Sequence, residues 1–127
     1  YGAFGALVGH ELSHALDARG RMVDAGGALR DWWTSSEAAA WDALGHRVVA
    51  LYDGLPYPQL NGVKVNGRLG RDENLADLAG VELARAALLA ALPAGGADAD
   101  KAFYRGWAQL WAQQVTADEA QRRSLQD

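Results

Sequence analysis

Residues 3–16 constrain the fold of this chain most, because the segment is almost entirely apolar or small and yet carries three side chains that can bind a metal. These are His10, Glu11 and His14, in the pattern His-Glu-x-x-His. In an α-helix, a step of four residues leaves His10 and His14 about 40° apart on one face and one turn apart along the axis. Glu11 then projects about 60° to the side of His14, within reach of a water held by the two imidazoles.

The remaining circumference of this predicted helix is apolar, and a helix that is apolar nearly all round is a buried one. Burial of a carboxylate and two imidazoles with no Lys or Arg nearby is costly unless a cation compensates. Zinc prefers imidazole and carboxylate ligands, and a catalytic zinc site has three protein ligands and a water. The pattern alone leaves two interpretations open: a zinc site, or two histidines that are satisfied by hydrogen bonds in a core. A third ligand elsewhere in the chain favours zinc.

The composition restricts the class of protein and the kinds of site. A chain of 127 residues, 50% of them hydrophobic, suits one folded domain with a sizeable core. The net charge of −4 and the lack of a basic cluster argue against nucleic acid as a partner. The sequence has no cysteine, which excludes disulfide bonds and thiolate metal ligands. No apolar run is long enough to span a bilayer, so no membrane segment is predicted in this chain.

Hydrophobic periodicity and turn residues predict a mainly α fold with at most a small hairpin. A first helix is predicted over residues 3–18, with Gly20 as its left-handed stop. Thr34 and Glu37 form a predicted capping box for a second, amphipathic helix. Residues 61–67 contain two Asn-Gly pairs and predict a hairpin or tight turn. Three later helices are predicted at residues 72–92, after a cap at Asp98 or Asp100, and from Thr116 to about residue 124.

The predicted helix at residues 72–92 offers the third ligand. Its apolar residues at 75, 78 and 81 indicate that most of it is buried, so Glu73 can supply a zinc oxygen. An acidic helix start on the protein surface is the alternative, because negative charge there is favoured by the helix dipole. Asp77 and Asp17 can each accept the spare N–H of a liganding histidine. Two carboxylates and two small residues share one face, which permits close approach of another helix: Glu73, Asp77, Gly80 and Ala84.

Four segments together resemble one family. The first is residues 1–17 with Gly20-Arg21 after them, and the second is Asp-Trp-Trp-Thr at 31–34. The third is Asn-Gly-Arg-Leu at 66–69 followed by Glu-Asn-Leu-Ala-Asp at 73–77, and the fourth is the aromatic helix at 103–111. In these residues and in their order, the chain resembles the neprilysin and endothelin-converting-enzyme family of zinc metallopeptidases. The resemblance covers essentially the whole chain.

The resemblance implies a peptidase that binds one Zn²⁺ per chain and hydrolyses peptide bonds in peptide substrates. The zinc ligands would be His10, His14 and Glu73. Glu11 would be the general base that takes the proton of the attacking water. Carboxylates that orient the histidines would be Asp17 and Asp77. The residues implied to line the pocket for the substrate residue after the scissile bond, with a preference for a hydrophobic side chain, are Ala6, Leu7, Leu110 and Trp111.

The resemblance also predicts that residues 1–127 are a single domain, part of the zincin-type catalytic domain of a longer peptidase. The family usually has Gly where this chain has Asp72, so the backbone and charge next to Glu73 are expected to differ. The strand that aligns the substrate and the His that stabilises the oxyanion in the family are expected outside residues 1–127. We therefore expect weak or no hydrolysis by these residues alone. Because family members are often exported or membrane-anchored, an extracytoplasmic location is favoured.

Two other functions remain open from the sequence. One is a non-catalytic zinc-binding or interaction module, a degenerate relative of the family. Two observations argue against such a module. It has no use for a base such as Glu11, and structural zinc sites usually have four protein ligands, whereas three are evident here. The other is a helical domain without metal, whose histidines and carboxylates are only hydrogen-bonded core residues. Metal analysis separates this last function from the other two.

Overall fold

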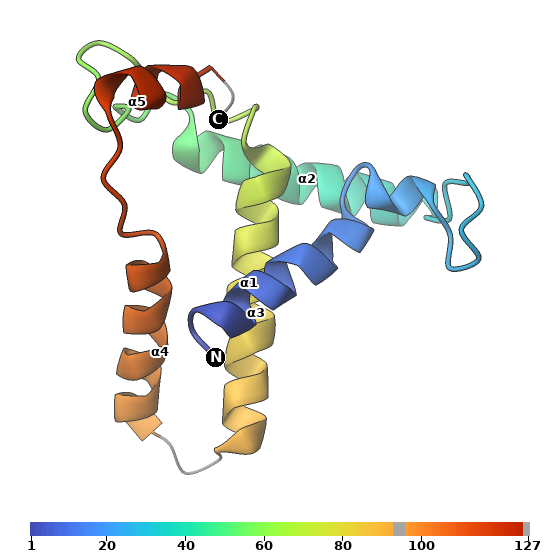
Figure 1. Ribbon diagram of the computed structural model, residues 1–127. Helices are drawn as coiled ribbons and strands as arrows, with labels where there is room; N and C mark the ends of the chain where they lie inside the picture. Colours follow the sequence, from blue (N-terminus) through green and yellow to red (C-terminus); the bar gives the residue numbers. More distant parts are fainter. Residues whose placement is uncertain (93–95, 126–127) are drawn as a thin grey trace.

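The computed structural model describes residues 1–92 and 96–125, and Figure 1 traces their path. These residues form five α-helices and no strand, which confirms the prediction of a mainly α fold. The helices are α1 (Phe4–Ser13), α2 (Ser35–Tyr52), α3 (Arg71–Ala91), α4 (Gly96–Leu110) and α5 (Ala117–Arg123). None of these five helices is long and apolar enough to cross a membrane.

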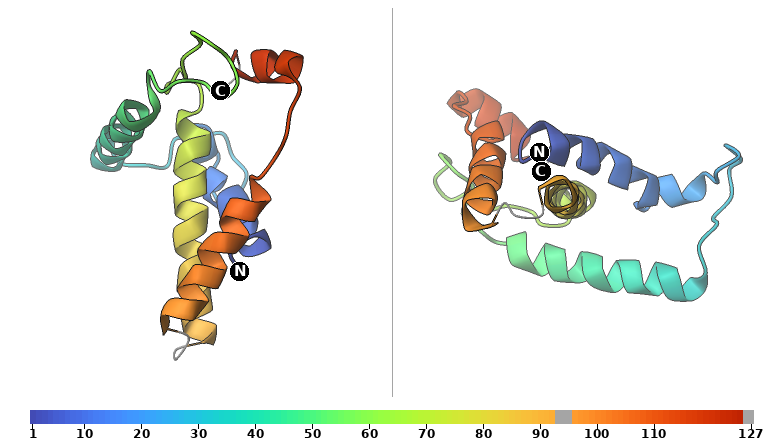
Figure 2. Two further views of the ribbon diagram at one scale, coloured as in Figure 1. Left: turned by 90° about the vertical axis from the view of Figure 1, so that its left-hand side faces the viewer. Right: turned by 90° about the horizontal axis from the view of Figure 1, so that it is seen from below.

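Helix α3 is the centre of the arrangement. The view along α3 in Figure 2 shows α1 on one side of it and α2 on the other, with α4 between them at a third side. Its contact with α1 is more extensive than its contact with α2. Helix α4 is tied to α3 by Arg85, whose Nε and Nη2 each donate to an oxygen of Asp100 at 3.1 Å. Helix α3 thus holds together segments that are far apart in the sequence.

Helix α1 is shorter than the sequence predicts. The α-helix ends at Ser13 and continues as a single 3₁₀ turn over His14–Leu16. The cause is Asp17, whose Oδ1 accepts the backbone N–H groups of residues 19 and 20 at 2.8 and 2.7 Å and so competes with the helix. The prediction of Gly20 as a left-handed stop is wrong, because Gly20 has no positive φ. Glycine is needed there because a Cβ would collide with the carbonyl oxygen of His14.

Helix α2 begins with the predicted capping box. Thr34 Oγ1 accepts the N–H of Glu37 at 3.3 Å, and Glu37 Oε2 accepts the N–H of Thr34 at 2.7 Å. The two side chains satisfy N–H groups that have no partner within the helix. The apolar stripe of α2 is only partly buried, since Val48 is 2% exposed and Leu51 is 67% exposed.

The segment between α2 and α3 turns tightly, as its Asn-Gly pairs predict. Gly62 has a φ of 78°, the left-handed conformation that glycine adopts without strain. The flanking residues form one isolated antiparallel bridge, between Pro56 and Lys64, and no pair of strands. The N–H of Gly67 donates to Asp53 Oδ1 at 3.1 Å and closes the segment onto the end of α2.

The predicted caps of the last two helices have different outcomes. Asp98 and Asp100 do not cap α4, because the helix begins at Gly96 and both residues lie inside it. Thr116 caps α5 as predicted, since its Oγ1 accepts the N–H of Glu119 at 3.2 Å. Pro93, which directly follows the helix predicted at residues 72–92, lies outside the described residues.

The apolar surface of α1 is largely exposed, so the prediction of a buried helix is wrong. Phe4 is 75% exposed and Leu12 is 66% exposed. On α3, Leu78 is likewise 49% exposed. A helix buries only the face that has a partner. Because α1 turns its small residues toward α3, the large apolar residues on its other faces remain in solvent.

The core of the described chain lies where α1, α3 and α4 meet. Its buried residues are Ala6, Ala84, Leu88 and Phe103. Phe103 has the largest side chain of the four and is 3% exposed. Replacing Phe103 with alanine is expected to lower the free energy of unfolding by about 3 kcal/mol, because apolar contacts are lost and a cavity remains. Urea unfolding followed by circular dichroism measures this loss.

The matched control is the neighbouring aromatic residue Tyr104, which is 48% exposed. Replacing Tyr104 with alanine removes a side chain of similar size from the same turn of α4 and is expected to cost about 1 kcal/mol. Equal losses for the two variants would show that Phe103 does not hold the core together.

Candidate metal centre

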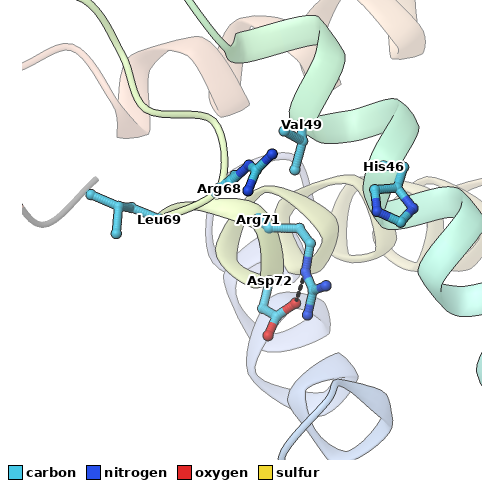
Figure 3. Close-up of a pocket in the computed structure, with 6 residues that line it drawn as sticks. All are labelled: His46, Val49, Arg68, Leu69, Arg71 and Asp72. Atoms are coloured by element: carbon cyan, nitrogen blue, oxygen red, sulfur yellow. Dashed lines mark hydrogen bonds and ion pairs between the residues drawn. The ribbon is translucent and has the colours of Figure 1, made fainter.

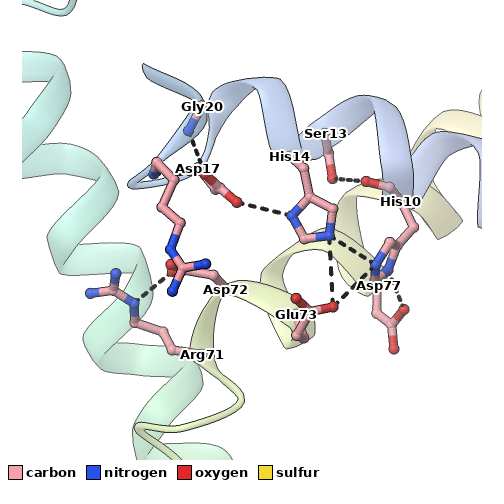
Figure 4. Close-up of polar contacts among 10 residues, drawn as sticks. His10, Ser13, His14, Asp17, Gly20, Arg71, Asp72, Glu73 and Asp77 are labelled. Carbon is pink, nitrogen blue, oxygen red and sulfur yellow. Dashed lines mark hydrogen bonds and ion pairs between the residues drawn. The ribbon is translucent and has the colours of Figure 1, made fainter. Parts of the chain in front are cut away.

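His10 of α1 and His14, which directly follows the helix, meet at the crossing with α3, as Figure 4 shows. His10 lies in the last turn of the α-helix, and His14 opens the 3₁₀ turn that follows. Their Nε2 atoms are 3.1 Å apart, and their rings meet edge to face with 83° between the planes. His10 is 8% exposed, whereas His14 is half-buried. The four-residue spacing therefore brings one nitrogen from each ring to a common point.

Glu73, in the first turn of α3, brings a carboxylate oxygen to the same point. Its Oε2 lies 3.3 Å from His10 Nε2 and 3.7 Å from His14 Nε2. The side chain of Glu73 is 69% exposed, so the carboxylate closes the group from the solvent side. Within the described residues, these three side chains form a group that could hold a metal ion. Each offers one possible ligand atom, and these atoms all lie within 4.8 Å of one another.

The distances among the three atoms fit a tetrahedral zinc ion. Bonds of about 2.0–2.2 Å at tetrahedral angles place neighbouring ligand atoms about 3.3–3.6 Å apart. The three observed separations, 3.1, 3.3 and 3.7 Å, lie within a few tenths of an ångström of this range. Two imidazoles and one carboxylate are also a ligand set of catalytic zinc sites, which keep one position open. The residues present therefore fit zinc.

Each histidine has a carboxylate on its other ring nitrogen. His10 Nδ1 lies 2.7 Å from Asp77 Oδ1, and His14 Nδ1 lies 2.9 Å from Asp17 Oδ2. Because an ionised carboxylate only accepts hydrogen bonds, each Nδ1 is the donor to its carboxylate, and Nε2 of each ring is directed toward Glu73. A cation or a shared proton between these two nitrogens and the carboxylate oxygen would relieve the repulsion among three acceptor atoms.

The two supporting carboxylates differ in their electrostatic surroundings. Burial raises the pKa of Asp77, and the hydrogen bond from its histidine offsets only part of that effect. Burial also acts to raise the pKa of Asp17, but hydrogen bonds from the Gly20 backbone, the His14 ring and the Arg19 backbone together lower it below its ordinary value. Asp17 is therefore held as an anion by several donors, whereas the side chain of Asp77 has one histidine as its donor.

Two residues of α1 that lie between or beside the histidines have contrasting surroundings. Glu11 is exposed, so its carboxylate is accessible to water. Ser13 is 8% exposed, and its hydroxyl donates to the backbone oxygen of His10 at 2.7 Å. Sequence reasoning did not identify this bond, although a serine three residues after a buried helix position commonly makes one.

The residues implied to line the substrate pocket lie in different surroundings. Ala6 is fully buried and packs in the core between the helices. Leu7 and Leu110 are half-buried. Trp111 is 46% exposed and lines a hollow of about 310 Å³ together with Tyr57. Within the described chain, Ala6 therefore serves in packing.

A further hollow of about 350 Å³ opens where α3 begins, between α3 and α2 (Figure 3). Its lining residues are His46, Val49, Arg68, Leu69, Arg71 and Asp72. Arg71 Nε donates to Asp72 Oδ1 at 2.8 Å, a hydrogen bond that raises the pKa of Arg71. The sequence identified Asp72 as a departure from the family but not its partner. The pair balances the charge that Asp72 adds beside Glu73.

The family of the chain follows from comparison with family models. The model of Peptidase family M13 matches residues 1–127. The chain belongs to peptidase family M13. This membership, together with the relatives below, confirms the resemblance to the neprilysin and endothelin-converting-enzyme family.

Among curated M13 relatives, endothelin-converting enzyme 1 of Rattus norvegicus is 33% identical over 136 aligned residues, which cover 100% of this chain and 18% of the enzyme. The neutral endopeptidase of Lactococcus lactis subsp. cremoris is 34% identical over 118 residues, which cover 93% of this chain and 18% of that enzyme. The chain thus spans less than a fifth of the length of these two relatives.

Solved structures show the same relationship. The zinc metalloprotease Zmp1 of Mycobacterium tuberculosis in its open state has a TM-score of 0.89 and 31% identity, with 100% of this chain and 21% of that chain covered. PepO from Lactobacillus rhamnosis HN001 has a TM-score of 0.79 and 36% identity, with 98% and 19% covered. The helical arrangement described above is therefore that of a family M13 segment.

Proposed function

We propose that this chain carries the catalytic centre of a zinc-dependent peptidase, with His10, His14 and Glu73 as zinc ligands and Glu11 as general base. The observation that supports the proposal most is the convergence of the three ligand atoms at 3.1, 3.3 and 3.7 Å, with a carboxylate behind each imidazole. The relatives support the reaction class, since one is named a neutral endopeptidase and another a zinc metalloprotease.

The chemistry divides between the ion and the side chains. When bound, zinc supplies a positive charge that acidifies a water and polarises the scissile carbonyl. His10 and His14 contribute neutral nitrogens, whose direction is fixed by the hydrogen bonds from Nδ1 to Asp77 and Asp17. Glu11 is exposed beside His10, takes the proton of the attacking water and delivers it to the leaving amine. One peptide bond is broken, and one water is consumed.

The open surroundings of the site predict slow hydrolysis by these 127 residues alone. Glu11 and Glu73 are both exposed, and charges stabilise a transition state less in water than in a closed site. A preorganised oxyanion donor is typically worth about 10²–10³ in rate. The donor that the family resemblance implies is expected outside residues 1–127. We propose that the chain is one domain of a larger catalytic assembly, and its extracytoplasmic location stays a prediction.

The pocket assignment belongs to the same proposal. Leu7 and Leu110 are half-buried and can offer apolar surface to a substrate side chain. With Ala6 and Trp111, they favour peptides that carry a hydrophobic residue after the scissile bond. Ala6 would contribute by its small size, because it is fully buried.

Two measurements on the purified chain test the proposed function. Elemental analysis after dialysis against low zinc is expected to give one zinc per chain. A quenched fluorescent peptide with Phe or Leu after the scissile bond is expected to be cleaved slowly, and 1,10-phenanthroline is expected to abolish the cleavage. A chain without zinc contradicts the metal site. Bound zinc without chelator-sensitive cleavage leaves the ligand set intact and contradicts catalysis by these residues alone.

The hydrogen bond between Asp77 and His10 leads to a separate prediction. Replacing Asp77 with alanine is expected to weaken zinc binding about 10- to 100-fold, because the His10 ring loses the acceptor that fixes its direction. Competition with a chromophoric zinc chelator measures the change. The matched control is Asp72→Ala, which removes a carboxylate from the first turn of α3 but one paired with Arg71. Equal affinities for the two variants would refute the orienting role of Asp77.

A further inference from the structure

Helices α1 and α3 cross at two glycines, Gly9 and Gly80. A Cβ added to Gly9 would lie 2.9 Å from both the Cα and the carbonyl oxygen of Gly80. A Cβ added to Gly80 would lie 2.6 Å from the backbone nitrogen of His10 and would also collide with the carbonyl oxygen of Ala6. All these neighbours are backbone atoms, so no rotation of a side chain can relieve the contact.

The crossing lies beside the metal-binding side chains. Gly9 directly precedes His10, and Gly80 follows Asp77 by three residues on the same face of α3. Glu73 stands one turn before Asp77 on that face. The two contacts that span the crossing, His10 to Asp77 at 2.7 Å and His10 to Glu73 at 3.3 Å, therefore depend directly on the distance between the helices.

The distance by which an added Cβ would separate α1 and α3 determines whether Glu73 can still bind the ion. Cβ contacts under 3.0 Å essentially never occur and ordinary contacts begin at 3.4 Å, so a Cβ on Gly80 has to move from 2.6 Å to about 3.0–3.4 Å from His10 N. The helices would then separate by about 0.4–0.8 Å, whereas zinc–ligand distances tolerate only about 0.2 Å. A single methyl group at this position is therefore enough to carry the Glu73 carboxylate out of bonding range of an ion held by His10 and His14.

We propose that Gly9 and Gly80 are positioning residues of the metal centre, which set the spacing of α1 and α3 at which Glu73 reaches the ion bound by the two histidines. The inference rests on the metal site of the proposed function. The requirement for glycine is steric, because both residues lie inside helices and neither has a positive φ. Alanine has the higher helix propensity, so weaker helices cannot explain a loss of zinc in an alanine variant.

Helix α1 contains another glycine that serves as a matched control. Gly5 lies one turn before Gly9 on α1 and also faces α3. A Cβ added there would lie 3.5 Å from the Cβ of Ala84, which is an ordinary van der Waals contact. Gly5→Ala therefore makes the same chemical change on the same face of α1 without separating the helices.

The first experiment measures zinc affinity by chelator competition for the whole chain and for Gly80→Ala, Gly9→Ala and Gly5→Ala, with helix content checked by circular dichroism. We expect the affinity to fall at least about tenfold in Gly80→Ala, less in Gly9→Ala, and not at all in Gly5→Ala. Wild-type affinity in Gly80→Ala would overturn the inference. A parent chain that binds no zinc would instead refute the metal site of the proposed function.

A double-mutant cycle separates positioning from general damage to the fold. Glu73→Ala is expected to cost at least about tenfold in zinc affinity in the parent chain but less than about twofold in Gly80→Ala, because the glutamate is already out of reach there. The visible absorption of bound Co²⁺ is expected to change in the same way in Gly80→Ala and Glu73→Ala. Additive losses would overturn the inference. If Gly80→Ala lacks helical circular dichroism, Gly9→Ala takes its place in the cycle under the same criterion.

Discussion

Replacing His10 with alanine is expected to reduce zinc from one ion per chain to none after dialysis against a weak chelator. His10 is the most buried of the three proposed ligands, at 8% exposed, and its ring contacts the other two and Asp77. Its removal leaves two ligands, and a two-ligand site forfeits much of the roughly 10–16 kcal/mol that a full zinc site provides. Elemental analysis and isothermal titration calorimetry measure the loss.

The control for this variant is His46→Ala. His46 is exposed on α2 and lines the hollow at the start of α3, away from the three converging ligand atoms. The variant removes the same imidazole from the chain, so it reports any zinc that binds to histidine in general. We expect one tightly bound zinc in His46→Ala. Retention of that ion by His10→Ala with unchanged affinity would refute the ligand set.

The local geometry of the metal site was predictable because helical periodicity determines it. Four-residue spacing brings His10 and His14 to one face, and the same rule aligns Glu73, Asp77 and Gly80 on another helix. The stripe of carboxylates above small residues further indicated that a second helix approaches closely. At the crossing, the backbones of Gly9 and Gly80 do approach too closely for an added Cβ.

The burial of α1 was not predictable from its own residues. Its apolar circumference predicted an interior helix, yet Phe4 and Leu12 are 75% and 66% exposed. Burial depends on how many faces find a partner, and in the described chain α3 takes the face of small residues. The end of α1 was misjudged for a related reason. The Asp17 side chain accepts the backbone N–H groups of residues 19 and 20 and ends the helix, so no left-handed glycine is required to end it.

The reaction class could not be predicted from helical periodicity and residue spacing either. Two histidines and a glutamate that converge predict a metal, but the same geometry suits a structural ion and a catalytic one. What identified the family was the order of four segments, and the match to family M13 over residues 1–127 confirms it. The residue proposed to distinguish catalysis from metal binding is Glu11, which is exposed beside the histidines.

Changing Glu11 to glutamine is expected to abolish most peptide cleavage while zinc remains bound. The amide has nearly the shape of the carboxylate but cannot accept a proton from the attacking water, and general-base catalysis typically contributes about 10²–10⁴ in rate. Because Glu11 is exposed and its carboxylate is outside the ligand group, zinc affinity and stability are expected to stay close to those of the parent chain. Product formation by mass spectrometry over long incubations gives the rate, and chelator competition gives the affinity.

The control for the glutamine variant is Glu82→Gln, which removes the same charge from an exposed position of α3. It separates loss of the base from the change in net charge, and cleavage is expected at the parent rate. Cleavage by Glu11→Gln at the parent rate, with zinc present, would refute the base assignment and leave the metal site intact. A loss of both zinc and cleavage would show that Glu11 acts through the ion and not through the proton. The proton transfer is assigned to this carboxylate only if Glu11→Gln retains zinc and loses cleavage.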